Sequence, residues 1–208
     1  MAMSLNLGST FNHLLDVLSA RATSDSLACM GLTAKSSAFG RVTLFLSVGV
    51  LFFLRWRQVG SVDYVNPVTV SDWLAVVGFS TALLFVAVAL PVYAGLTEDR
   101  ATYRISLVPA IGLTVASVAN LVEDGWGWSG AFWPYVLSSI VYALGLIALT
   151  FEVARKKRGI GRIGAVVPAG TLLGLVFFES WGGPVLLLSW FAAALVALSM
   201  RNALAKND

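Results

Sequence analysis

The stretch Asn120-Leu-Val-Glu-Asp-Gly-Trp-Gly-Trp128 lies between two long apolar segments and combines two acids with two tryptophans and two glycines. Trp is enriched where a membrane meets water, and Gly permits tight turns. The flanking segments, at about residues 105–122 and 131–151, have the apolar character of membrane-crossing helices. The stretch therefore predicts the outer turn of a helical hairpin, and it matches no motif that identifies a reaction.

The composition predicts that the whole chain belongs in lipid. Its 208 residues are 58% hydrophobic and 12% charged, with a mean hydropathy of +0.82, whereas soluble domains average about 45–50% apolar and roughly a quarter charged residues. This length suits one domain of about five to seven helices. The net charge of +3 does not predict nucleic-acid binding, because basic residues of membrane proteins gather on the cytoplasmic side.

Cysteine and histidine usage excludes several kinds of site. Cys29 is the only cysteine, so neither an internal disulfide nor a multi-cysteine metal cage can form. His13 is the only histidine and lies outside the apolar segments, which excludes a histidine-rich metal site. The chain also lacks a Walker loop, a Gly-x-Ser-x-Gly elbow and a His-Glu-x-x-His motif. We therefore expect no metal and no cofactor.

The apolar runs predict an all-α membrane protein, a six-transmembrane-helix bundle with spans at about residues 37–56, 73–96, 105–122, 131–151, 163–178 and 184–200. The apolar core of the first span, Val42 to Leu54, is short. A bundle of five spans is therefore the alternative. Residues 201–208 are expected to form a polar cytoplasmic tail.

The segments around the first spans are expected to be irregular or interfacial. Residues 1–36 form a cytoplasmic segment of mixed polarity, in which Ser9 to Arg21 has the spacing of a short amphipathic helix. In the long loop 57–72, Ser71 or Asp72 is expected to cap the second span. Residues 97–104 are expected to form a short loop.

The basic residues predict how the bundle is oriented. Five of them fall between Glu152 and Arg162, which predicts a cytoplasmic loop there. With six spans, both termini are then cytoplasmic, and the acidic turn faces outward. Arg55 and Arg57 are expected on the same outer side as that turn. The short loops are compatible with a bacterial inner membrane.

Two hairpins of the chain repeat one pattern. Val108-Pro-Ala-Ile-Gly112 leads through an apolar run into Glu123-Asp-Gly-Trp-Gly127, and Val167-Pro-Ala-Gly170 leads into Glu179-Ser-Trp-Gly-Gly183. Small membrane folds are often built from internal repeats, which makes a duplicated hairpin one interpretation. Chance similarity between apolar segments is the other. Duplication would put the acids at equivalent positions on one rim.

Helical phase sorts the polar residues around the turn. At about 100° per residue, Asp124 lies in line with Ser106, Ser117 and Asn120, whereas Glu123 points about a quarter-turn away. A second stripe on the next span holds Tyr135, Ser138, Ser139 and Tyr142, and Gly145 would let another backbone approach. Polar side chains in lipid face neighbouring helices or a wet cavity. The two stripes are therefore expected to face each other.

These patterns define the candidate site residues. The catalytic candidates are the acids Asp124, Glu123 and Glu179, and the ligand-binding candidates are Asn120, Ser117, Tyr135, Tyr142, Trp126 and Trp181. Carboxylates that share a proton beside an apolar rim suit acid–base chemistry or proton-coupled binding. The structural alternatives are helix packing for the Ser and Tyr residues, an interfacial belt for the Trp residues, and helix capping or pairing with Arg55 and Arg57 for the acids.

Three functions fit these observations. The first is an accessory or small-ligand or lipid-binding membrane subunit, whose partners are membrane lipids and either another protein or a second copy of the chain. The second is a membrane-embedded enzyme that acts on a lipid or isoprenoid substrate by carboxylate acid–base catalysis. The third is a small transporter or channel, although mid-span acids or bases, which most proton-coupled pumps require, are absent from the sequence.

Overall fold

The computed structural model describes residues 38–61, 67–97, 99–156 and 161–204, and these residues contain helices and turns but no strand. The predicted amphipathic helix of the N-terminal segment lies outside the described residues. The helices are α4 (Ala38–Trp56), α5 (Val70–Gly95), α6 (Arg100–Asn120), α7 (Phe132–Arg155), α8 (Gly161–Gly164), α9 (Val166–Val176) and α10 (Gly183–Leu204). A five-residue π-helical turn follows each of α6 and α9, η1 (Leu121–Gly125) and η3 (Phe178–Gly182), and a short 3-10 turn, η2 (Ser129–Ala131), precedes α7.

The chain is a helical membrane protein with several spans. Five helical segments of the described residues are long and apolar enough to cross a membrane: Phe39–Trp56, Val70–Gly95, Arg100–Gly125, Ser129–Arg155 and Phe178–Ser199. The first predicted span is among them. The fifth predicted span corresponds to α9, an apolar helix of 11 residues, which is shorter than the ~20 residues that a crossing needs.

Two helices begin earlier than the sequence predicted, because their caps lie further upstream. Thr69, and not Ser71 or Asp72, is the N-cap of α5. The carboxylate of Asp72 completes a capping box by accepting a hydrogen bond from the Thr69 backbone N–H at 2.8 Å. Asp99 caps α6 by accepting the Thr102 N–H at 2.9 Å. Most of the predicted loop 97–104 is therefore the first turn of α6, and α10 likewise extends through Leu204 into the predicted tail.

The acidic stretch is largely helical. The prediction of a turn over Asn120–Trp128 was wrong for its first half, since η1 continues α6 through Gly125. The chain reverses only after that, where Gly127 has a φ of 68°, a conformation that favours glycine. Glu179 lies in η3, the matching π-helical turn after α9. The two acid-bearing segments thus share a local structure that is rare and is frequent at functional sites.

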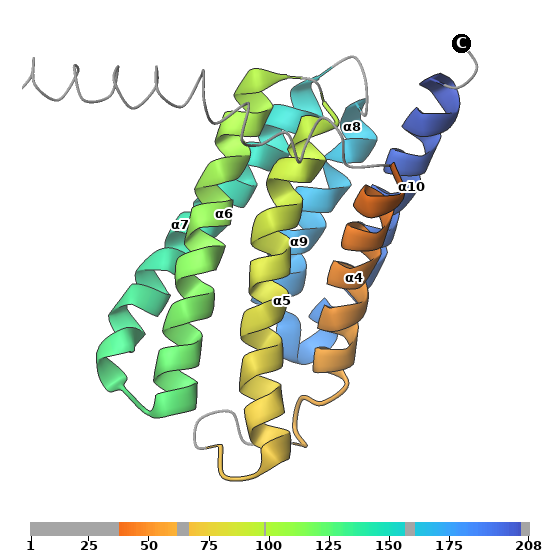
Figure 1. Cartoon of the computed structure of the whole chain (residues 1–208). Helices are drawn as coiled ribbons and strands as arrows, with labels where there is room; N and C mark the ends of the chain where they lie inside the picture. The colour runs from red at the N-terminus through yellow and green to blue at the C-terminus, as the bar shows by residue number, and fades with distance from the viewer. Residues whose placement is uncertain (1–37, 62–66, 98, 157–160, 205–208) are drawn as a thin grey trace, which may run out of the picture. The chain divides into compact units, whose positions relative to one another are not determined.

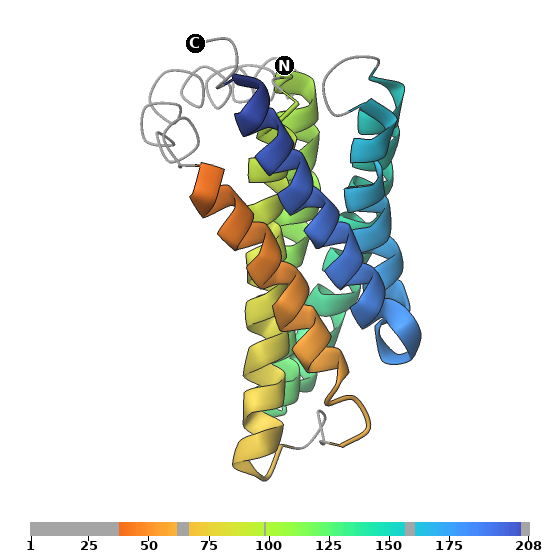
Figure 2. The ribbon, with the colours of Figure 1, turned by 90° about the vertical axis from the view of Figure 1, so that its right-hand side faces the viewer.

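Six helices form a ring in chain order. α5 contacts α4 and α6, α7 contacts α6 and α9, and α10 closes the ring by packing on α9 and α4 (Figures 1 and 2). We call the end of the bundle that holds η1 and η3 the acid-turn end. Phe45, Tyr93 and Trp190 are fully buried inside the ring, and the Phe45 ring meets Tyr93 edge-on at 6.1 Å and Trp190 at a tilt at 5.6 Å. The apolar core therefore joins α4, α5 and α10.

Glycines let neighbouring helices approach closely. A Cβ on Gly145 of α7 would lie 2.6 Å from Cδ of Pro109, and one on Gly112 of α6 would lie 2.8 Å from the backbone N of Tyr142. On the other side of the ring, a Cβ on Gly49 would lie 3.2 Å from Cα of Leu187. The expected close approach at Gly145 is confirmed, and it fixes α6 against α7.

Candidate functional site

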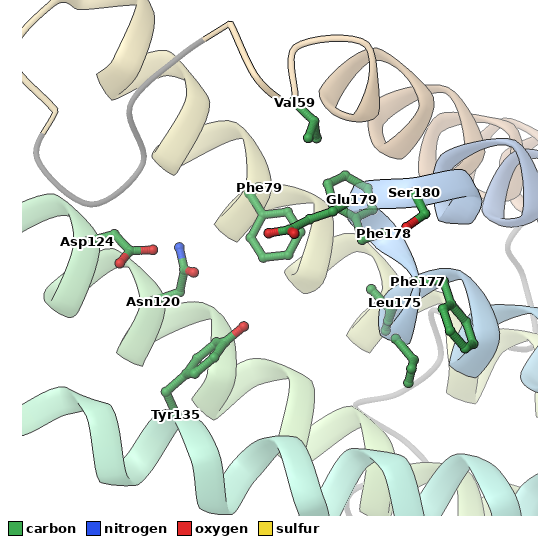
Figure 3. A pocket seen from close by; sticks show the side chains of 11 residues that line it. Val59, Phe79, Asn120, Asp124, Tyr135, Leu175, Phe177, Phe178, Glu179 and Ser180 are labelled. Carbon is green, nitrogen blue, oxygen red and sulfur yellow. The ribbon is translucent and has the colours of Figure 1, made fainter.

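A pocket of about 450 Å³ opens at the acid-turn end of the bundle. One wall carries Asn120 of α6, Asp124 of η1 and Tyr135 of α7. The opposite wall is the segment 175–180 at the end of α9 and the start of η3, which includes Glu179. Phe79 of α5 lies between the two walls (Figure 3). Four of the predicted site residues, from three separate parts of the chain, therefore line one cavity.

The two acids of the stretch differ in position. Asp124 lines the pocket and Glu123 is not among its lining residues, although both are partly buried. In Figure 3 the Asp124 carboxylate lies beside the Asn120 amide, and the Glu179 side chain extends from the opposite wall toward Phe79. The π-helical turn holds Asp124 on the same wall as Asn120, one turn further along the chain.

Hydrogen bonds to α5 hold the α6 wall. The amide of Asn120, which is 6% exposed, donates to the hydroxyl of Ser80 at 3.2 Å. The hydroxyl of Ser117 donates to the backbone carbonyl of Ser80 at 2.7 Å. The expectation that the α6 stripe faces the α7 stripe was therefore wrong for Ser117, and the amide N–H of Asn120 also points to α5, although Asn120 shares the pocket lining with Tyr135 of α7. A polar group buried among apolar helices binds the nearest free acceptor, and here that acceptor is on α5.

Aromatic contacts hold the opposite wall. The Phe178 ring centroid lies 5.3 Å from that of Phe79 and 5.8 Å from that of Phe52. The indole of Trp56 donates to the backbone carbonyl of Ser180 at 3.1 Å, which ties η3 to α4. These contacts fix the segment that carries Glu179, while the Glu179 side chain itself is exposed.

Within the described residues, no ion pair involves Glu123, Asp124 or Glu179. The predicted pairing with Arg57 is therefore not formed there, and Arg55 donates instead to the side chain of Gln58. Among the described residues, the walls are apolar and aromatic apart from a few polar groups, and the two carboxylates have no neutralising cation beside them. This arrangement can bind a positive group or exchange protons.

The opposite end of the bundle carries an ion-paired cluster. Lys156 Nζ lies 2.8 Å from Asp99 and 2.9 Å from Glu152, and Arg155 lies 2.6 Å from Glu152. The hydrogen bond from the Lys156 ammonium lowers the pKa of Asp99 well below its usual range, and bonds from Thr102 lower it further. The same contact raises the pKa of Lys156. Asp99 and Lys156 join the start of α6 to the end of α7.

The other predicted site residues lie outside the pocket lining. Ser117 is buried against α5, and Tyr142 packs beside Gly112. Trp126 is 69% exposed at the hairpin tip. Trp181 is 46% exposed and stacks on the ring of Phe177 at 4.8 Å. Their positions fit helix packing for the first two residues and an interfacial belt for the tryptophans.

Sequence reasoning missed the apolar half of the pocket. Phe79, Phe178 and Leu175 line it, and nothing in an apolar run distinguishes them from residues that face lipid. The four-residue offset between Leu175 and Glu179 was the one available signal, since it places both on one face of a helix. Among the described residues, no group of three or more His, Cys, Asp or Glu side chains could hold a metal ion.

No protein family model, curated protein or solved structure matches this chain.

Proposed function

We propose that this membrane protein is a non-enzymatic subunit that binds a small amphiphilic molecule or a lipid in the pocket at the acid-turn end. The observation that supports this most is a single cavity of about 450 Å³ that joins polar groups to an apolar wall. Ligand sites are commonly apolar clefts of about 300–1,000 Å³ with a few placed polar groups. An accessory role with a protein partner or a second copy of the chain stays a prediction.

Transport is supported less well than binding. A transport path would need polar groups that continue past Ser106 and Thr171. Both residues are fully buried, and their hydroxyls donate to their own helices, to the carbonyls of Tyr103 and Val167. Leu113, which is also fully buried, lies between Ser106 and the pocket residue Asn120 along α6.

An acid–base enzyme is the second candidate, because Asp124 and Glu179 reach the same cavity from opposite walls. Such chemistry requires one carboxyl to be protonated while the other is ionised. An enzyme would differ from a binding protein in that the bound molecule would be chemically converted. In that case Asp124→Asn and Glu179→Gln would retain the molecule and lose its conversion.

The orientation is part of the proposal and rests on the sequence. The basic residues between Glu152 and Arg162 favour a cytoplasmic position for the ion-paired end. The acid-turn end would then face outward, and both termini would be in the cytoplasm if the short α9 crosses together with the five longer segments. A bacterial inner membrane is the location that we propose.

The test is purification of the full chain in nanodiscs, followed by native mass spectrometry of the bound molecules. Leu175→Trp adds bulk at a lining position, and Leu173→Trp adds it on the same helix at an exposed position outside the lining. We expect a retained amphiphile in the wild type and in Leu173→Trp, and its loss in Leu175→Trp. Equal retention in all three proteins would contradict the proposal.

A further inference from the structure

The pocket is negatively charged. Among the described residues, its lining includes Asp124 and Glu179 and no Lys, Arg or His. Neither carboxylate forms an ion pair among the described residues. Asp124 is partly buried, and the apolar groups around it strengthen the field of its charge, whereas Glu179 is exposed and its charge is more strongly screened by water. A phosphate or carboxylate ligand would be repelled from this cavity, and a cation would be attracted.

The uncharged groups of the pocket favour a cation as well. Asn120 is more than nine-tenths buried and gives its amide N–H to Ser80. Its carbonyl oxygen has no hydrogen-bond partner among the described residues and lies on the pocket wall near Tyr135 (Figure 3). With the two carboxylates, this oxygen makes a third acceptor that an N–H donor of a ligand could satisfy.

Aromatic rings of the apolar half lie beside these polar groups. Phe79 and Phe178 both line it, with ring centroids 5.3 Å apart, and Tyr135 faces them from the α7 side. The faces of aromatic rings attract cations, and clusters of such rings recognise substituted ammonium groups. The rings attract an ammonium group and an apolar chain but have no comparable attraction for an anion.

One side of the pocket leads to the exposed surface of the bundle. Leu175, Val176 and Phe177 line it, and Val176 and Phe177 are 61% and 41% exposed. These side chains lie at the end of α9, which is an apolar helix. They therefore provide an apolar contact for an alkyl chain. A ligand that fits both halves has a charged head and an apolar tail.

We infer that the pocket selects an amphiphile with an organic ammonium head, held by Asp124, Glu179 and Asn120, with its tail against Leu175 to Phe177. This inference rests on the proposed binding function and names the class of its ligand. The charge of the head group is the property that the pocket selects, since the tail contacts are available to any apolar chain.

The test compares three probes with the same ten-carbon chain, decylamine, decanol and decanoate, on the full chain in zwitterionic nanodiscs at pH 7. Titration calorimetry, with empty nanodiscs subtracted, measures the affinity of each. We expect saturable binding of decylamine that is at least about tenfold tighter than that of decanol, and weaker binding still for decanoate. Added salt should weaken only the decylamine binding.

Substitution of single acids tests which carboxylates attract the ammonium head of decylamine. Asp124→Asn and Glu179→Gln should each weaken decylamine by about tenfold and leave decanol unchanged. Glu123→Gln removes a neighbouring acid outside the lining and should weaken decylamine far less than either lining variant does. An equal loss in Glu123→Gln would overturn the inference, because the attraction would then come from the general surface charge.

The results also separate this inference from the proposed function. If decanol binds as tightly as decylamine and Leu175→Trp abolishes both, the pocket binds amphiphiles without selecting charge, so only the inference fails. If none of the probes binds nanodiscs that contain the protein more tightly than empty nanodiscs, both the inference and the proposed function fail.

Discussion

The two acid-bearing hairpins, α6–η1–α7 and α9–η3–α10, share a sequence pattern and a local structure but differ in length. In each, a Val-Pro-Ala helix ends in a π-helical turn that carries an acid. Without their turns, α6 has 21 residues, Arg100–Asn120, whereas α9 has 11, Val166–Val176. At about 1.5 Å per residue, α9 is ~17 Å long.

This difference explains where the pocket lies. In Figure 1, η3 turns back before it reaches the level of the last turns of α6 and the first turns of α5. The longer helices therefore extend past the tip of the shorter hairpin, and the pocket lies between Asp124 on one and Glu179 on the other. A repeat with one short copy can create a cavity that two equal copies would fill. Duplication of the hairpin stays a prediction.

The largest expected effect comes from the glycines that end the two π-helical turns. A Cβ on Gly182 in η3 would overlap the backbone oxygen of Gly174 and would lie 2.8 Å from the backbone carbonyl of Phe177, and neither backbone group can move aside easily. A Cβ on Gly125 in η1 would meet two side chains, the ring of Trp73 at 3.2 Å and Cδ1 of Leu121 at 3.5 Å, and no backbone atom is among these contacts. We expect Gly182→Ala to lower the free energy of unfolding by about 1–3 kcal/mol and Gly125→Ala by less than about 1 kcal/mol, as for overpacked sites.

Reversible unfolding in mild detergent measures both variants. Gly95→Ala is the control, since no atom lies within 4 Å of its added Cβ. Equal losses of unfolding free energy for Gly182→Ala and Gly125→Ala would contradict this prediction, because they would show that the two turns are packed alike.

A smaller effect is expected where the first hairpin is bound to α5. Asn120→Ala removes the 3.2 Å bond to Ser80, and hydrogen bonds between membrane helices contribute about 0.6 kcal/mol on average. Ser80→Ala removes the same bond from the other side. A double-mutant cycle should give a coupling energy of about 0.5–1 kcal/mol. Strict additivity of the two losses would mean that this bond does not stabilise the wall of the pocket.

The smallest effect is expected at the ion-paired end of the first hairpin. The folded pKa of Asp99 is lowered from its ordinary value of 3.8, chiefly by Lys156. The stability that this adds is present above the ordinary pKa and is lost as the pH falls toward the folded one. Asp99→Asn keeps a good helix cap and removes the charge.

Thermal unfolding at pH 7 and pH 3 measures this contribution. Between pH 7 and pH 3, the midpoint temperature of the wild type should fall slightly more than that of Asp99→Asn. High salt should reduce this difference. An equal fall in both proteins would mean that the pair does not bind the two ends of the hairpin together.

The sequence predicted the positions of the helices well and their ends less well. Apolar runs reveal a span wherever it lies, because lipid excludes polar backbone that is not in a helix. The helix starts were misplaced because Thr69 and Asp99 cap α5 and α6 through side-chain hydrogen bonds, and hydropathy does not show where such caps lie. The π-helical continuation through Glu123 and Asp124 was missed for a similar reason: acids and a glycine resemble a turn.

The amino-acid pattern alone determined that the chain is a helical membrane protein with an acidic turn, and helical phase separated Asp124 from Glu123. Only the tertiary structure decided that Asp124 and Glu179 share a cavity, that Phe79 and Phe178 line it, and that Ser117 and Asn120 bond to α5. The reason is physical. Hydropathy reports which segments enter lipid, whereas the contacts between segments depend on helix length and close packing at single glycines, and on which polar partner is nearest.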